Sequence, residues 1–160
     1  MNTKKLVTAS VLLALGFILH IIAPPLIMGI KPDFLLAMMF LAIFINPDIK
    51  NAMIISIAAG ILTGITTTLP NGLLANLIDK IITGFIVYNL TKFTKFNFLN
   101  MIIISIIGTY ISGTLCLLVA FLGDFTMYFA NLPVVIITAL LNGFIVPFIY
   151  KLEKTAIKKS

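Results

Sequence analysis

The sequence predicts an all-α integral membrane protein, a bundle of six transmembrane helices with both termini in the cytoplasm. Three observations predict it: 61% of the 160 residues are hydrophobic, only 10% are charged, and the apolar residues fall into runs of membrane length. A soluble domain is usually about 45–50% apolar and about 25% charged, so a soluble globule of this composition would not cover its surface with polar groups. The composition therefore excludes a cytosolic enzyme, a nucleic-acid-binding domain and a disordered linker.

The apolar runs delimit six predicted spans in one membrane domain, residues 1–160. A helix needs about 20 residues to cross a hydrocarbon core of roughly 30 Å. The predicted spans are residues 6–23, 33–46, 51–69, 74–90, 98–122 and 133–150. The second span is short, so we expect it to cross a thin part of the membrane or to enter it only partly. A loop is expected from residue 123 to residue 131.

The lysines predict the orientation in the plasma membrane, because short loops rich in Lys and Arg stay in the cytoplasm. The chain has 11 Lys and no Arg. With both termini inside, nine of these lysines lie in the cytoplasmic termini and loops. The two exceptions are Lys31, in the first outer loop, and Lys80, within the fourth span.

Asp79 and Lys80 are adjacent charged residues inside an apolar span. A charged side chain at mid-bilayer costs on the order of 2.5–3.5 kcal/mol, so both residues are expected to face protein or a water-filled cavity. Asn76 and Thr83 lie on the same side of a helix as this pair. The stripe predicts either a ligand site or an internal ion pair that only joins helices.

Other polar residues are expected at the same depth, namely Lys31 and Asp33 at the outer start of the second span and Asn142 midway along the sixth. An amino-acid zwitterion needs a cation and an acceptor for its two charged ends, and an aromatic substrate also needs flat apolar walls. The candidate walls are Phe34, Phe85, Tyr110, Phe125 and Tyr128. The predicted substrate-binding residues are Lys31, Asp33, Asn76, Asp79, Lys80 and Asn142.

The sequence lacks the motifs of several other function classes. It has no phosphate-binding G-x-x-x-x-G-K-[ST] loop, no nucleophile elbow and no H-E-x-x-H motif, so neither nucleotide hydrolysis by the usual route nor an enzyme is expected. Cys116 is the only cysteine and His20 the only histidine, so no metal site and no cofactor are expected in this chain.

Short motifs in order along nearly the whole chain carry a resemblance. The most specific are Lys31-Pro32-Asp33 and Asn76-x-Ile78-Asp79-Lys80, which place unusual polar groups in an apolar setting. Further matching stretches are Leu19-His20, Pro24-Pro25, Pro70 with Gly72, Gly108-Thr109 with Ser112-Gly113, and Leu141-Asn142. With its six short spans, the chain resembles the tryptophan transport protein family, the proposed tryptophan-specific S components of energy-coupling factor transporters.

The resemblance implies an S-component-like fold and a substrate-binding subunit that takes up tryptophan from outside. Two cytoplasmic ATPase subunits and a transmembrane coupling subunit, all separate chains, would drive the transport. The family's first helix carries A-x-x-x-A, thought to contact the coupling subunit, and this chain has Ser10 and Ala14 there.

For tryptophan as the substrate, we expect the following roles for the site residues. Lys80 or Lys31 would bind the substrate carboxylate, and Asp79 or Asp33 its ammonium group. Asn76 or Asn142 would supply hydrogen bonds, including one to the indole N–H.

Three other functions are compatible with the sequence. The chain is alternatively an S component for another small molecule such as a vitamin, or a solitary proton-coupled carrier that uses Asp79. A structural subunit with an internal ion pair would bind no ligand.

Overall fold

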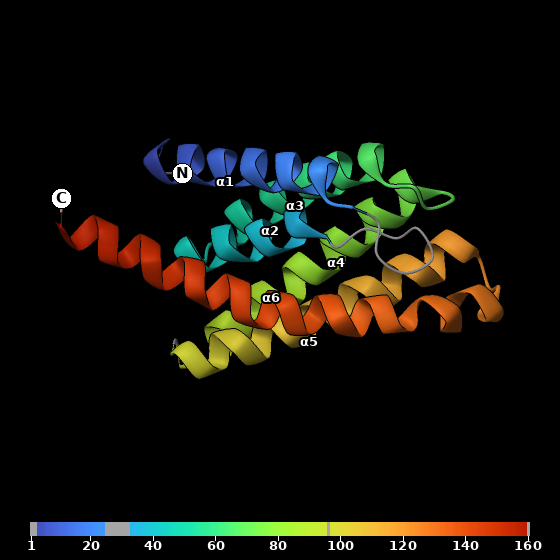
Figure 1. Ribbon diagram of the computed structural model, residues 1–160. Helices are drawn as coiled ribbons and strands as arrows, with labels where there is room; N and C mark the ends of the chain where they lie inside the picture. The colour runs from blue at the N-terminus through green and yellow to red at the C-terminus, as the bar shows by residue number, and fades with distance from the viewer. Residues whose placement is uncertain (1–2, 25–32, 96, 160) are drawn as a thin grey trace.

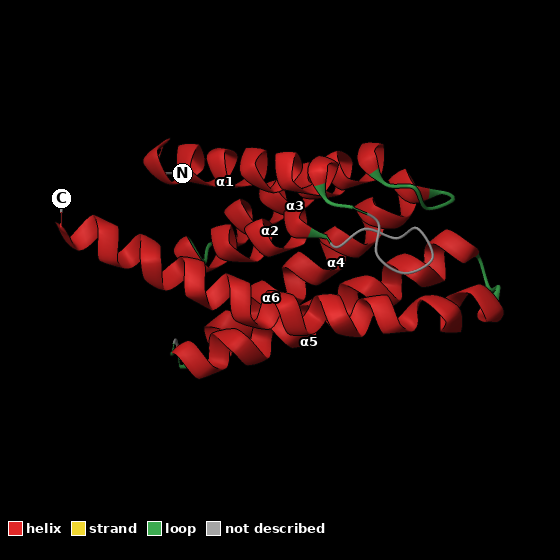
Figure 2. Cartoon of the chain, viewed as in Figure 1, coloured by secondary structure: helices red, strands yellow, loops and turns green. Residues whose placement is uncertain are grey.

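The computed structural model describes residues 3–24, 33–95 and 97–159, and within these ranges it contains helices and no strand (Figures 1 and 2). The helices are α1 (Thr3–Ile22), α2 (Phe34–Ile45), α3 (Ile49–Thr66), α4 (Gly72–Phe93), α5 (Phe98–Phe121) and α6 (Phe125–Lys159). The all-α prediction is therefore confirmed.

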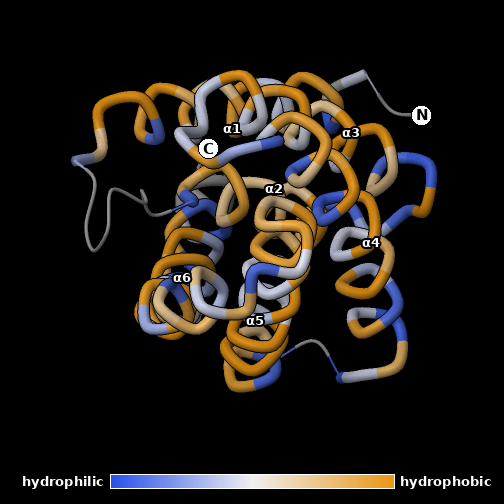
Figure 3. The backbone as a smooth tube through the Cα atoms, turned by 90° about the vertical axis from the view of Figure 1, so that its right-hand side faces the viewer, coloured by the Kyte–Doolittle hydropathy of each residue, from blue (hydrophilic) through white to orange (hydrophobic). Residues whose placement is uncertain are grey.

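The helix α2 lies at the centre of the bundle, and the other helices surround it (Figure 3). It contacts each of the other five helices, whereas α1 contacts only α2 and α3 among the described residues. An isolated surface helix shows one apolar stripe, but α2 is apolar on all sides, which is the pattern of a helix buried in a core. Ten of its 12 residues are buried.

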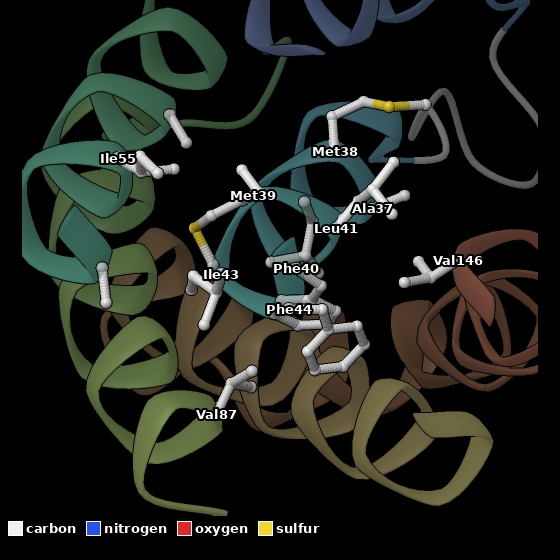
Figure 4. Packing of buried hydrophobic residues seen from close by; sticks show 14 of the residues in the cluster. Ala37, Met38, Met39, Phe40, Leu41, Ile43, Phe44, Ile55, Val87 and Val146 are labelled. Atoms are coloured by element: carbon white, nitrogen blue, oxygen red, sulfur yellow. The ribbon is translucent and has the colours of Figure 1, made fainter. Parts of the chain in front are cut away.

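The core consists of α2 side chains that point outward into the surrounding helices. Figure 4 shows Met39 and Phe40 among them, with Ile55 of α3, Val87 of α4 and Val146 of α6 on the facing helices. Phe40 lies beside Gly108 of α5, where a Cβ atom would come within 2.8 Å of the phenyl ring. The absence of a side chain at Gly108 therefore lets α5 approach α2 closely.

Five helices are long and apolar enough to cross a membrane, and α2 is the exception. At 1.5 Å per residue its 12 residues extend about 18 Å, well short of a hydrocarbon core of roughly 30 Å. Large apolar side chains on the outer faces of the long helices, such as Ile54, Phe85 and Phe144, are exposed, as expected of surfaces that contact lipid. The predicted bundle of six helices thus consists of long helices around one short central helix.

The last helix differs from the prediction. It begins at Phe125 rather than Pro133, so most of the predicted loop from 123 to 131 is helical. Asp124 ends the connection, because its Oδ1 accepts hydrogen bonds from the amides of Thr126 and Met127 at 3.0 and 3.2 Å. Pro133 lies inside the helix, where membrane-spanning helices tolerate proline better than soluble helices do.

The two termini lie at the same end of the bundle (Figure 1). The helix α6 has 35 residues, about 50 Å, and extends past its neighbours at this end. The opposite end holds the α3–α4 and α5–α6 connections. The lysines at the terminal end include Lys5, Lys50, Lys92, Lys95, Lys151 and Lys154.

This charge distribution predicts that the terminal end faces the cytoplasm. In a Cys116→Ser background, a cysteine introduced at Pro70 should react with an impermeant thiol reagent in intact cells. A cysteine at Lys95 should react only after the cells are permeabilised. Both positions are exposed, so accessibility depends on the side of the membrane. The opposite labelling pattern would show an inverted orientation.

Candidate functional site

A cavity lies inside the bundle toward the end opposite the termini. Its described lining comes from all six helices and the residues next to them, including His20 of α1, Asp33 before α2, Thr63 of α3, Lys80 of α4, Ser112 of α5 and Asn131 of α6. The cavity has a volume of about 80 Å³. Ligand sites typically measure about 300–1,000 Å³, so a bound molecule the size of an aromatic amino acid requires the walls to move apart.

The ammonium group of Lys80 is the centre of the site. Its Nζ lies 2.6 Å from Oδ2 of Asp33 and 3.1 Å from Oδ1 of Asp79. It also donates to the Ser112 hydroxyl, at 3.4 Å. The side chain is only 1% exposed. A charge buried in a membrane bundle needs such partners, because the apolar surroundings offer it neither an opposite charge nor a hydrogen bond.

Asp79 is held in place by Lys80 and Ser112. Its Oδ1 accepts a 2.7 Å hydrogen bond from the hydroxyl of Ser112, and its side chain is fully buried. The pair of residues on α4 is thereby tied to α5.

Asp33 has two different roles at once. Its Oδ1 accepts a 3.0 Å hydrogen bond from the amide of Leu36 and so caps the start of α2. Its Oδ2 forms the ion pair with Lys80. The side chain is 19% exposed, which makes it the most accessible member of the charged cluster.

Most of the predicted site residues that the structure describes lie together at the cavity. Asn76 lines the cavity with Asp33, Asp79 and Lys80, and its Nδ2 donates to the carbonyl of Gly72 at 2.7 Å. Asn142 does not line the cavity; its Nδ2 donates to the hydroxyl of Thr109, which does. Lys31 lies outside the described residues.

The predicted aromatic walls are wrong for the described lining. Phe85, Tyr110 and Phe125 are exposed on outer surfaces. Phe34 and Tyr128 are not among the residues that line the cavity either. The apolar walls are instead aliphatic, made by Leu36, Leu69, Leu117, Val134 and Val135.

Sequence reasoning missed several polar residues of the lining. Ser112 stands among the small residues of Gly108-Thr109 and Ser112-Gly113, which are typical of close helix packing, and Asn131 falls in the stretch predicted as a loop. Asn131 is 3% exposed; its Nδ2 donates to the carbonyl of Met127 at 2.7 Å, and its Oδ1 accepts no hydrogen bond within the described part of the chain. His20 is also buried and lines the cavity, although a single histidine in the sequence gave no indication of a place in the site.

The described residues contain no group of three or more His, Cys, Asp and Glu side chains placed to hold a metal ion. The described lining provides the Lys80 ammonium, two carboxylates, hydroxyls, amides and aliphatic walls. This arrangement suits the recognition of a small charged molecule with an apolar part.

Comparison with known proteins gives a consistent family. A family model described as Tryptophan transporter TrpP matches residues 2–158. A probable tryptophan transport protein of Bacillus subtilis (strain 168) is 36% identical over 167 residues, which cover 100% of this chain and 96% of the relative. Another, from Clostridium perfringens (strain 13 / Type A), is 32% identical over 176 residues, with 99% and 96% covered. A third, from Clostridium acetobutylicum, is 42% identical over 120 residues, with 73% and 70% covered.

No solved structure is significantly similar to the chain. The relatives are bacterial transport proteins, and five helices of this chain have membrane length. The chain is accordingly a multi-pass protein of the bacterial plasma membrane.

Replacing Lys80 tests how much the charged cluster contributes to the stability of the fold. The variant Lys80→Met leaves two buried carboxylates without their cation and should lower the free energy of unfolding by about 3–5 kcal/mol. Adding Asp33→Asn removes one of these carboxylates and should restore part of the loss. Unfolding in detergent micelles measures both effects.

The matched control is Lys50→Met, at an exposed position of α3, which should change stability by less than about 0.5 kcal/mol. Equal effects of Lys80→Met and Lys50→Met would contradict a stabilising role for the buried ion pair.

Proposed function

Because this chain belongs to the tryptophan transporter TrpP family, we propose that it is the substrate-binding membrane subunit for tryptophan uptake by an ATP-driven energy-coupling factor transporter. The observation that carries the proposal is the buried Lys80 ammonium at the cavity wall, with a carboxylate from α4 and another from the start of α2.

The charges of the cluster are complementary to those of an amino acid. The Lys80 ammonium is the cation for a substrate carboxylate, and two carboxylates are available where one would balance that lysine. The second carboxylate provides an acceptor for the substrate ammonium group. Charge-assisted hydrogen bonds of this kind are roughly twice as strong as neutral ones.

The rest of the lining is complementary to an indole ring. The aliphatic walls bury its apolar surface, and Asn131 offers an acceptor for its single N–H. A hydrogen bond to Oδ1 of Asn131 would satisfy a buried acceptor that has no other partner within the described residues. We assign the indole N–H to Asn131 rather than to Asn76 or Asn142.

The packing around the site supports transport that depends on partner subunits. Beyond Asp33, toward the terminal end of the bundle, the centre is occupied by the tightly packed apolar side chains of α2. A solitary carrier needs a polar route past this helix. The sequence also has no nucleotide-binding loop, so separate ATPases would supply the energy through a transmembrane coupling subunit.

The helix α1 supplies a suitable docking surface for that coupling subunit. Ser10 and Ala14 are exposed on it, about a quarter turn around the helix from the buried residues Ala9 and Leu13. Since α1 contacts only α2 and α3 among the described residues, its outer face is available to another membrane helix. Small residues at this spacing allow close approach of helix backbones.

Tryptophan binding is directly measurable because the chain contains no Trp. Indole fluorescence excited at the red edge of the absorption band then reports only the ligand. Transfer of the indole into an apolar pocket should shift its emission to the blue in a saturable manner. A titration of the purified protein that shows no saturable shift would rule out tryptophan as the ligand.

Two controls accompany this titration. Phenylalanine, which has no indole N–H, should displace tryptophan only weakly. Lys80→Met should reduce the affinity roughly 30-fold or more, the loss expected when a buried charge loses its partner, whereas Lys50→Met should not change it. A tryptophan shift that persists in Lys80→Met would retain the ligand and exclude Lys80 from the site.

Docking through α1 predicts a separation of binding from assembly. Ala14→Phe should abolish co-purification with the coupling subunit and the ATPases, because the larger side chain prevents close backbone approach. Tryptophan binding by the isolated subunit should remain unchanged, and the substitution adds no Trp to the chain.

The control is Ile103→Phe, an exposed apolar position on α5 far from α1, which should leave the complex intact. Loss of tryptophan binding in Ala14→Phe would show that Ala14 is needed for the internal packing. Retention of the complex would contradict docking through this face.

A further inference from the structure

All three donors of the Lys80 ammonium group are engaged in this structure. They face Oδ2 of Asp33 at 2.6 Å, Asp79 at 3.1 Å and the hydroxyl of Ser112 at 3.4 Å. A protonated lysine has three N–H donors and no acceptor. A ligand carboxylate therefore binds Lys80 only by replacing one of these three partners.

Asp79 is the partner that is hardest to replace. It is fully buried, neighbours Lys80 in the sequence, and accepts a further 2.7 Å hydrogen bond from Ser112. Its removal from Lys80 would leave a carboxylate inside the bundle without its cation. The energetic penalty of such an unpaired buried charge is large.

Replacement of Ser112 is also unfavourable, although its contact with Lys80 is the longest. A ligand carboxylate in that position would be the third carboxylate around one ammonium group, beside those of Asp33 and Asp79. Repulsion between like charges at short distance opposes this arrangement in a medium of low dielectric constant.

Asp33 is the partner that the geometry allows to move. Its side chain is 19% exposed, against 1% for Lys80 and 0% for Asp79. Its two oxygens have separate roles, since Oδ1 accepts from the amide of Leu36 while Oδ2 faces Lys80. The helix cap can therefore persist while Oδ2 turns to another cation.

We propose that an amino acid binds by inserting into the ion pair between Asp33 and Lys80. Its carboxylate takes the place of Asp33 at Lys80, and its ammonium group pairs with the released Oδ2 of Asp33. Every charge then keeps an opposite partner, because one ion pair is exchanged for two. This inference rests on the proposed function and assigns to Asp33 the selection of ligands that carry both charges.

The insertion has a clear consequence for ligands that carry one charge. Indole-3-propionate has the carboxylate without the ammonium group, so its binding would leave Asp33 unpaired. Tryptamine has the ammonium group without the carboxylate, so it cannot replace Asp33 at Lys80. Both should bind the unchanged protein about tenfold or more weaker than tryptophan, as expected for the loss of a charge-assisted hydrogen bond.

Asp33→Asn reverses this preference. The neutral amide gives up its place at Lys80 without leaving a charge unpaired, so indole-3-propionate should bind the variant about tenfold or more tighter than it binds the unchanged protein. Tryptophan should bind about tenfold or more weaker, because its ammonium group loses its carboxylate. Fluorescence titration of the purified variants with both ligands measures the ratio of the two affinities.

Two further variants make the test specific. Asp33→Ser should give the same reversal, and both Asn and Ser are good helix caps, so the start of α2 is preserved. The control is Asp48→Asn. Asp48 caps α3 in the same way, accepting from the amide of Asn51 at 3.1 Å, but lies at the other end of the bundle, so neither affinity should change.

The outcomes separate this proposal from the proposed function. An unchanged ratio of the two affinities in Asp33→Asn and Asp33→Ser, with tryptophan still bound, would overturn the insertion and leave the function standing. Equal affinities of the unchanged protein for tryptophan and indole-3-propionate would do the same without any variant. Failure of the unchanged protein to bind tryptophan would overturn both.

Discussion

The position of the central helix depends on one buried ammonium group. Packing between apolar helices in a membrane is only weakly specific, because lipid tails are as apolar as leucine side chains. The helix α2 is apolar on all sides, so the burial of apolar surface does not by itself determine its depth or its rotation within the bundle. The ion pair between Asp33 and Lys80 does, since it joins the first turn of α2 to the middle of α4 at a distance of 2.6 Å. Ser112 extends the same cluster to α5.

A cluster that joins three helices and also lines a cavity would connect folding with the proposed ligand recognition. Any molecule that competes for Lys80 acts on the contact that positions α2. Because α2 contacts every other helix of the bundle, a change at its first turn reaches the whole subunit, including α1.

The charged part of the site was predictable from the sequence, and its apolar part was not. Asp79 and Lys80 stand out because charges within an apolar span need partners inside the protein. The walls do not stand out, because a leucine that faces lipid and a leucine that faces a cavity have the same chemistry. The sequence therefore favoured aromatic residues that do not belong to the described lining of the cavity.

Two other differences have local causes. Pro133 is a good first residue for a helix, which hid the fact that α6 begins at Phe125 and carries Asn131 into the cavity. Ser112 was hidden because small residues are also the ordinary means of close helix packing. The fold class, by contrast, was predictable from the sequence, because long apolar runs in a membrane have few alternatives to the helix.

The shortness of α2 has a consequence for biosynthesis. As a helix, a nascent segment of 12 apolar residues is only about 18 Å long, so it is too short to cross the hydrocarbon core with all its backbone groups hydrogen-bonded. The Asp33 carboxylate at its start makes insertion still less favourable. Such a segment is a poor independent substrate for insertion, unlike the long helices that flank it. The partner of Asp33 is encoded 47 positions later, within α4. We therefore expect the central helix to reach its final place only after α4 has been synthesised.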